Sequence, residues 1–215
     1  MTSHTVAIIA AATVLSSCAP VHAPRVDLDR TRLHSLTRIT LLETTEPLPH
    51  QVMTLDYALR PTDPSLYEAL KPELGQLVKG LTLQLQQQLE AQGYRVSLAN
   101  APSDISREAL KELVAQSDAV LHVSLALFLG PNENSTAFVP WVNGFYTFQT
   151  ASLEILSRQQ ITIGKKLRVS DAHQLDARSP IAFQSLDDVQ MPKVAAYFRD
   201  ALKQMGEAIT ADLSN

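Results

Sequence analysis

The sequence predicts an α+β fold in which a single mixed β-sheet is covered on one face by about three helices. In the segment 119–129 every second residue from position 121 is Leu or Val, which is the period of a half-buried strand. The segments 74–89 and 192–213 each carry one apolar stripe at helical spacing. Strands and helices follow one another irregularly, which favours one sheet with a helical layer over regular repeating units.

The first half of the domain is predicted to place its helices between short strands. Asp63 is expected to cap the first helix with Pro64 at its first position, and Pro72 should kink or restart it. Gly93 is a suitable residue to end this helix, and Ser106 can cap the next one. The strands expected here span 36–42, 52–59 and 94–98, and the second helix carries Leu110, Leu113 and Val114.

The second half begins with the strand 119–129, which we expect to be central. Burying its five Leu and Val side chains stabilises the fold by roughly 1.5–3 kcal/mol each. A long loop is expected from Gly130 to Gly144. Two strands, 145–156 and 161–169, should then form a hairpin around residues 157–160. A closing helix is expected at about 192–213.

Composition indicates an ordinary globular domain. The 215 residues are 45% hydrophobic, which is enough for a sizeable core. The net charge of −4 offers no polybasic face, so nucleic acid is not an expected partner. A single cysteine leaves no pair for a disulfide and no Cys-based metal site.

The N-terminal segment predicts where the protein resides. An apolar run from Val6 to Leu15 is too short for a membrane span of about 20 residues, but it suits a signal-peptide core. Leu15-Ser16-Ser17-Cys18 resembles the lipobox of bacterial lipoproteins. That resemblance implies cleavage before Cys18 and fatty acylation of this residue, palmitate included. The alternative is a buried N-terminal element with a core cysteine.

We therefore expect a signal peptide at 1–17, a lipidated tether at 18–34 and a periplasmic α+β domain at 35–215. In enterobacterial lipoproteins an aspartate after the cysteine favours retention at the inner membrane. Ala19 stands there in this chain, so it resembles the outer-membrane class. The predicted location is a lipid-anchored, periplasm-facing position at the outer membrane.

Catalytic motifs are absent from the sequence, and we expect no enzyme, no metal and no cofactor beyond the covalent lipid. Ser170, Asp171 and His173 place three triad residue types almost side by side. A working triad needs these groups to converge in space, which near neighbours at a strand end rarely do. A polar loop explains them better.

The loop expected at 130–144 holds the best candidates for partner binding: Phe138, Val139, Trp141 and Val142. Exposed aromatic residues are frequent anchors of protein interfaces. The alternative is that Phe138 and Trp141 fold back over a sheet edge. His122 and Ser124 lie on the less apolar face of the central strand, where they would be polar contacts for a ligand, or solvated sheet residues.

The segment from Leu85 to Val96, with its Gly93-Tyr94 step from helix to strand, resembles a unit of penicillin-binding-protein activators and of the N-terminal Tol translocation domain. The order of elements is similar to the neuraminyllactose-binding haemagglutinin lipoproteins. These resemblances imply a fold type and no binding residues. The expected function is a non-enzymatic lipoprotein that binds an envelope or secretion-system protein. The alternative is a carrier or adhesin that holds a lipid or glycan between sheet and helices.

Overall fold

The computed structural model of the chain describes residues 25–28, 30–33, 35–44, 46–58, 60–63, 65–101, 106–132, 134–165, 172–175 and 179–214. The predicted signal peptide and Cys18 lie outside these residues. In chain order the elements are α1 (Arg30–Leu33), β1 (Arg38–Leu42), η1 (Pro49–Gln51), β2 (Val52–Leu55), β3 (Pro61–Asp63), α2 (Ser65–Ala91), β4 (Arg95–Ala99), α3 (Arg107–Leu113), β5 (Ala119–Pro131), β6 (Phe138–Thr150), β7 (Ile155–Ile163), β8 (Ala172–Leu175) and α4 (Met191–Asp212).

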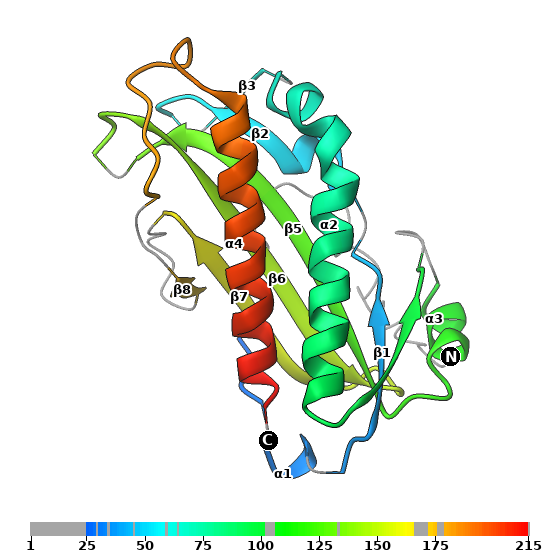
Figure 1. Cartoon of the computed structure of the whole chain (residues 1–215). Coiled ribbons are helices and arrows are strands. Elements are labelled where there is room, and N and C mark those ends of the chain that lie inside the picture. The colour runs from blue at the N-terminus through cyan, green and yellow to red at the C-terminus, as the bar shows by residue number, and fades with distance from the viewer. Residues whose placement is uncertain are drawn as a thin grey trace, which may run out of the picture.

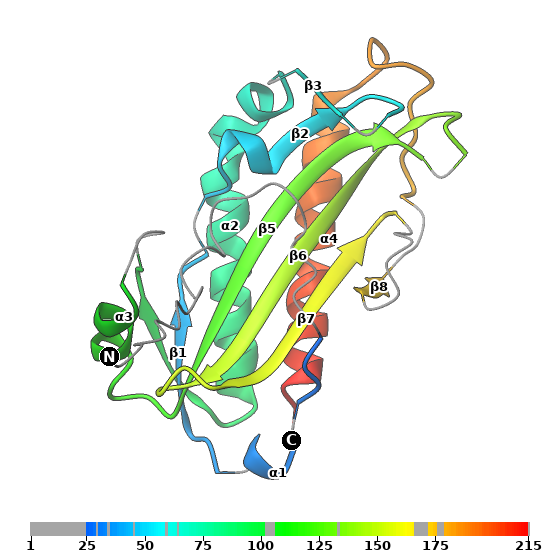
Figure 2. The same ribbon diagram turned by 180° about the vertical axis from the view of Figure 1, so that it is seen from behind.

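The predicted fold class is confirmed: within the described residues, one mixed sheet of eight strands carries the long helices α2 and α4 on one face (Figure 1). Strands β5, β6 and β7 form an antiparallel centre. Both β1 and β2 pair with β5 in parallel, β1 along its first residues and β2 along its last. Seen from behind, the face of β5, β6 and β7 is not covered by the long helices (Figure 2). We call this the helix-free face.

The central strand is confirmed. On β5 the side chains of Leu121, Val123, Leu125, Leu127 and Leu129 are buried in the main core, while His122, Ser124 and Ala126 are half-buried. The second of the three predicted helices, α3, is placed differently from α2 and α4. Leu110 and Val114 pack with Leu42 and Val120 in a separate small cluster. Val120 alternates with the core residues of β5, so this cluster lies on the helix-free side.

Helix α2 is longer and more continuous than expected. Asp63 belongs to β3, so the predicted cap at Asp63 is wrong, and the helix runs through Pro72 without a restart. A proline removes one backbone hydrogen bond. Buried leucines on both sides of Pro72 hold the helix against the sheet. The predicted apolar stripe is confirmed, and Gly93 ends the helix region with a φ of 96°.

The prediction of a loop from Gly130 to Gly144 is wrong. β6 begins at Phe138, pairs with β5 along its whole length, and turns at 151–154 instead of 157–160. Pro140 fits this strand because its nitrogen faces an edge without a partner strand. Phe138 exchanges backbone hydrogen bonds with Phe183 on that side at 2.8 and 2.9 Å, and β7 pairs only as far as Val142. Phe138 and Pro140 are two residues apart, so their nitrogens point to the same side of β6. The proline nitrogen therefore faces the side without a partner strand, and no hydrogen bond of the sheet is lost there.

Residues 25–28 and 30–33, the first that the structure describes, contact the rest of the domain. Val26 forms two backbone hydrogen bonds with Arg158 of β7, at 3.0 and 2.9 Å. Leu33 of α1 is buried in the main core, and Arg32 makes a bidentate ion pair with Glu154. Residues 25–28 and 30–33, which we expected to belong to the tether, therefore pack on the sheet and its turns.

Asp118 joins the starts of β1 and β5. Its carboxylate accepts hydrogen bonds from the backbone N–H groups of Thr37 and Arg38, both at 2.9 Å, and from the Thr37 hydroxyl and Arg38 guanidinium, both at 3.0 Å. The pKa of Asp118 lies far below its ordinary value. The main cause is the hydrogen bond from the Arg38 side chain, and the next is the hydrogen bond from the Thr37 backbone N–H. All four donors favour the ionised carboxylate.

We expect Asp118→Ala to lower the free energy of unfolding at pH 7 by about 1.5–3 kcal/mol, as is typical for hydrogen bonds to a charged group. Because the folded pKa lies below the unfolded value of about 3.9, this stabilisation is present above that pH and is lost as pH falls below it. Urea unfolding at pH 7 and near pH 3 checks this: the gap between wild type and variant should narrow in acid. Asp200→Ala, at an exposed site of α4, is the control. If the difference in free energy of unfolding between wild type and Asp118→Ala stayed constant with pH, the ionised Asp118 carboxylate would not be its cause.

Candidate binding surface at the hairpin end

The four predicted partner-binding residues lie on β6, and all are buried. Alternation along the strand divides them between the two faces of the sheet. Phe138 and Val142 belong to the main core under the helices. Val139 and Trp141 belong to a smaller cluster with Leu55 on the other face. The four side chains therefore do not form one exposed patch, as a loop would have allowed.

Trp141 is 4% exposed and packs inside the domain. Its ring stacks on Phe128, with centroids 5.0 Å apart and planes at 17°. It also lies over Gly130, where an added Cβ would be 2.9 Å from the indole. The Lys165 ammonium sits 4.2 Å from the ring centroid and donates to the Pro131 carbonyl at 2.8 Å. These contacts make Trp141 a packing residue that covers the end of β5; it is buried, but on a strand inside the sheet and not in a loop that folds back over a sheet edge.

His122 and Ser124 lie on the helix-free face, half-buried, opposite Thr147 and Phe145 of β6. Desolvation lowers the pKa of His122, so its imidazole is neutral at pH 7. Beside them, the side-chain oxygen of Asn143 accepts hydrogen bonds from the side-chain amide of Gln160 at 2.7 Å and from the Thr162 hydroxyl at 3.4 Å. Around His122 this face thus combines amide, hydroxyl and imidazole groups with the ring of Phe145.

A different aromatic residue, Tyr57, is exposed. The sequence places it on one face of a strand 52–59, but β2 ends at Leu55 and a turn follows. The Asp56 carboxylate accepts from the N–H groups of Ala58 and Arg60 at 2.8 and 2.9 Å, which shapes the turn. The Arg60 N–H and the other donors in this turn lower the pKa of Asp56. Tyr57 is 54% exposed, and its ring leans on Phe138 with centroids 5.1 Å apart.

The loop before α4 brings a second exposed apolar residue to the same end. Phe183 is buried and joined to Phe138 by their backbone bridge. Three residues later, Leu186 is 39% exposed. The β2–β3 turn, the tip of the β5–β6 hairpin and this loop lie together at one end of the sheet in both views (Figures 1 and 2). We call this region, residues 56–58, 132–138 without 133, and 179–190, the hairpin end.

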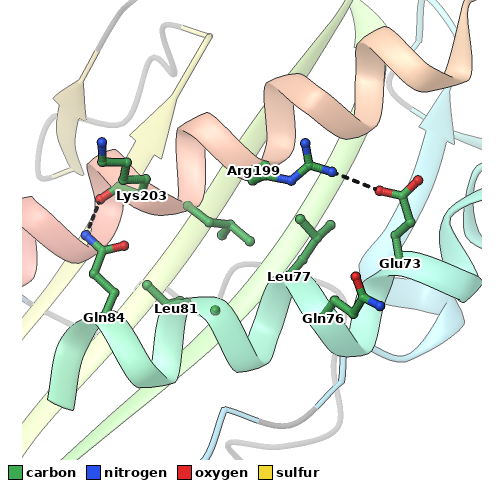
Figure 3. A pocket seen from close by; sticks show the side chains of 9 residues that line it. Glu73, Gln76, Leu77, Leu81, Gln84, Arg199 and Lys203 are labelled. Atoms are coloured by element: carbon green, nitrogen blue, oxygen red, sulfur yellow. Dashed lines mark hydrogen bonds and ion pairs between the residues drawn. The ribbon is translucent and has the colours of Figure 1, made fainter. Parts of the chain in front are cut away.

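A concave feature lies between α2 and α4, on the side away from the sheet. It is a groove of about 330 Å³ whose floor is formed by leucines. Two polar contacts cross it (Figure 3): Arg199 pairs with Glu73 at 3.3 Å, and the Gln84 amide donates to the Lys203 carbonyl at 2.9 Å. The interface between helices and sheet, where a ligand cleft was the alternative expectation, is filled by the buried side chains of the main core.

The described residues contain no group of three or more His, Cys, Asp or Glu side chains that could hold a metal ion. Within the same residues, no helix has the length and apolar character to cross a bilayer. Ser170 and Asp171 lie outside the described part of the chain, as does the side chain of His173.

No protein-family model and no curated protein matches the chain. Among solved structures it is similar to a neuraminyllactose-binding hemagglutinin homolog from Helicobacter pylori, with 17% identity, 91% of this chain and 89% of that chain covered, and a TM-score of 0.47. A Xanthomonas campestris protein of the DUF330 family model gives 13% identity, coverages of 87% and 83%, and a TM-score of 0.41. A lipoprotein from Neisseria meningitidis gives 14%, coverages of 59% and 81%, and a TM-score of 0.30. Similarity at this level transfers no function.

Proposed function

We propose that this protein is a non-enzymatic lipoprotein, anchored at the outer membrane through acylated Cys18, whose periplasmic domain binds an envelope or secretion-system protein. The anchor rests on the Leu15–Cys18 segment. The binding role rests on one observation: at the hairpin end, Tyr57 is more than half exposed while its ring is supported by the buried Phe138. Tyr57 therefore replaces Phe138 and Trp141 as the aromatic residue that contacts the partner.

Single exposed apolar residues are normal on protein surfaces. Tyr57 differs because its position is fixed: the Asp56 hydrogen bonds hold its turn, and Phe138 supports one side of the ring. A tyrosine held in this way loses little conformational entropy on binding, and tyrosine is enriched among the residues that dominate binding energy. Leu186 extends the apolar area at the same end.

A pull-down with the lipidated full-length protein tests this proposal. The double variant Tyr57→Ala/Leu186→Ala should reduce partner recovery by about tenfold or more, the loss typical of two interface anchors. The control is Leu83→Ala, which removes a leucine of similar exposure, 41%, from the outer side of α2. Recovery that stays at the wild-type level in the double variant would reject the hairpin end as the binding surface. Mass spectrometry of the mature N-terminus separately tests acylation of Cys18.

The second candidate is a lipid- or glycan-binding carrier or adhesin. The helix-free face supports it, because the half-buried side chains of Asn143, Phe145 and His122 place an amide, an aromatic ring and an imidazole on one face of the sheet, as a polar ligand such as a glycan requires. Native mass spectrometry of the purified protein separates the two functions: a co-purified small molecule, lost on Asn143→Ala, would favour the carrier.

A further inference from the structure

Gly80 lies in the interior of α2, where the fold gives no reason for a glycine. A helical glycine costs about 0.5–1 kcal/mol relative to alanine. On α4, Gly206 has a packing reason, because a Cβ there would lie 2.9 Å from the Gln84 side chain. At Gly80 an added Cβ meets nothing within 4 Å. The missing side chain therefore leaves open space that the domain itself does not use.

Gly80 is one of the residues that line the groove between α2 and α4, and Figure 3 shows the labelled side chains around it. Leu77, Leu81 and Leu202 form its floor. The groove volume of about 330 Å³ is at the small end of the range for binding pockets, enough for one apolar side chain with a short polar neighbour.

The rim of the groove is rich in hydrogen-bond donors. Within the described residues, the Lys203 ammonium and the Gln76 amide make no hydrogen bond or ion pair. Arg199 uses one guanidinium nitrogen for Glu73, and its other N–H groups remain available for a second acceptor. Two cations and one carboxylate line the groove, whereas Asp200 and Glu207 of α4 lie outside the lining. The complementary group is a carboxylate.

We propose that this groove docks an acidic segment of a protein partner. The segment places an apolar side chain over Gly80 and an Asp or Glu carboxylate at Arg199 and Lys203. This rests on the proposed function, that the domain binds a protein, and adds a contact surface on the helical side, separate from the hairpin end.

Photocrosslinking in cells that produce the full-length protein tests the groove. p-Benzoylphenylalanine is introduced at Gln76, on the rim, and at Leu83, on α2 outside the groove lining. The expected result is a protein adduct from position 76, with little from position 83, whose crosslinked peptide contains Asp or Glu next to an apolar residue. Gly80→Leu fills the groove and should reduce this adduct by about tenfold; Lys203→Glu should reduce it severalfold by like-charge repulsion.

Stability measurements separate groove filling from misfolding. Leucine has a higher helix propensity than glycine and its Cβ meets no atom, so Gly80→Leu should unfold at the same temperature as wild type or higher. The matched control Lys79→Glu changes a neighbouring charge outside the lining and should retain the adduct.

The proposal is overturned by an adduct that Gly80→Leu leaves unchanged, by a crosslinked peptide without a carboxylate, by adducts with lipid or small molecules only, or by no adduct above that of position 83. If Tyr57→Ala/Leu186→Ala abolishes partner recovery while the groove variants do not, the groove alone is rejected. If neither set affects any partner, the proposed function fails as well.

Discussion

Leu125→Asp is expected to unfold the domain. Leu125 is 4% exposed on the central strand, opposite Gly144, under the helical layer. Losing a buried leucine costs about 2–5 kcal/mol, and an unpaired carboxylate in the core adds several more. Together these approach the whole stability of a typical domain, about 5–15 kcal/mol.

Circular dichroism and thermal unfolding check this expectation. Leu83→Asp is the matched control, because it places the same charge at a leucine that is exposed on α2. The control should unfold within a few degrees of wild type. A Leu125→Asp protein with a wild-type melting curve would show that β5 is not central to the core.

Gly164→Ala should have the second-largest effect on stability. Gly164 has a φ of 90°, which alanine adopts at a cost of about 1–2 kcal/mol. Its Cβ would also collide with the Tyr197 hydroxyl of α4 and lie 2.9 Å from the Pro140 carbonyl, which overpacks a buried site at a further cost of about 1–3 kcal/mol.

The measurement is urea unfolding of Gly164→Ala beside Gly80→Ala. The same substitution should stabilise at residue 80, where the Cβ has room, and destabilise at residue 164. Adding Tyr197→Phe to Gly164→Ala removes the colliding oxygen and should restore part of the loss. Equal effects at the two glycines would contradict the packing described for the end of β7.

The candidate site shows why residue type alone misleads about exposure. The sequence favours a loop at 130–144 because glycine, proline and polar residues gather there. Gly130 is used to accommodate the Trp141 ring, and Pro140 sits where its nitrogen needs no partner. The first reason depends on the pairing of β5 with β6, and the second depends on the edge where Phe138 meets Phe183. Trp141 and Phe138 are candidate interface residues because they are aromatic, but the segments that pack around them bury both side chains.

Tyr57 was missed for the converse reason. Its alternation with Met53 and Leu55 predicts a strand face, but Asp56 accepts two backbone N–H groups and turns the chain at that point. An aspartate before Tyr-Ala-Leu-Arg is a weak turn signal when apolar residues surround it. Asp56 is the local signal for the turn, whereas the contact of Tyr57 with Phe138 has no local signal.

By itself the sequence determined the fold class, the central strand, the apolar stripe of α2 and the C-terminal end of that helix at Gly93. These follow from the period of apolar residues and from local backbone preferences, which are properties of neighbouring residues. The tertiary structure alone decided which aromatic rings are exposed, that α3 packs apart from α2 and α4, and that Gly80 lines a groove. These depend on contacts between residues far apart in the chain, such as Glu73 with Arg199, which are 126 residues apart, and Gln84 with Lys203, which are 119 residues apart. No local pattern encodes such contacts, because a side chain's partners are set by the packing of the whole chain.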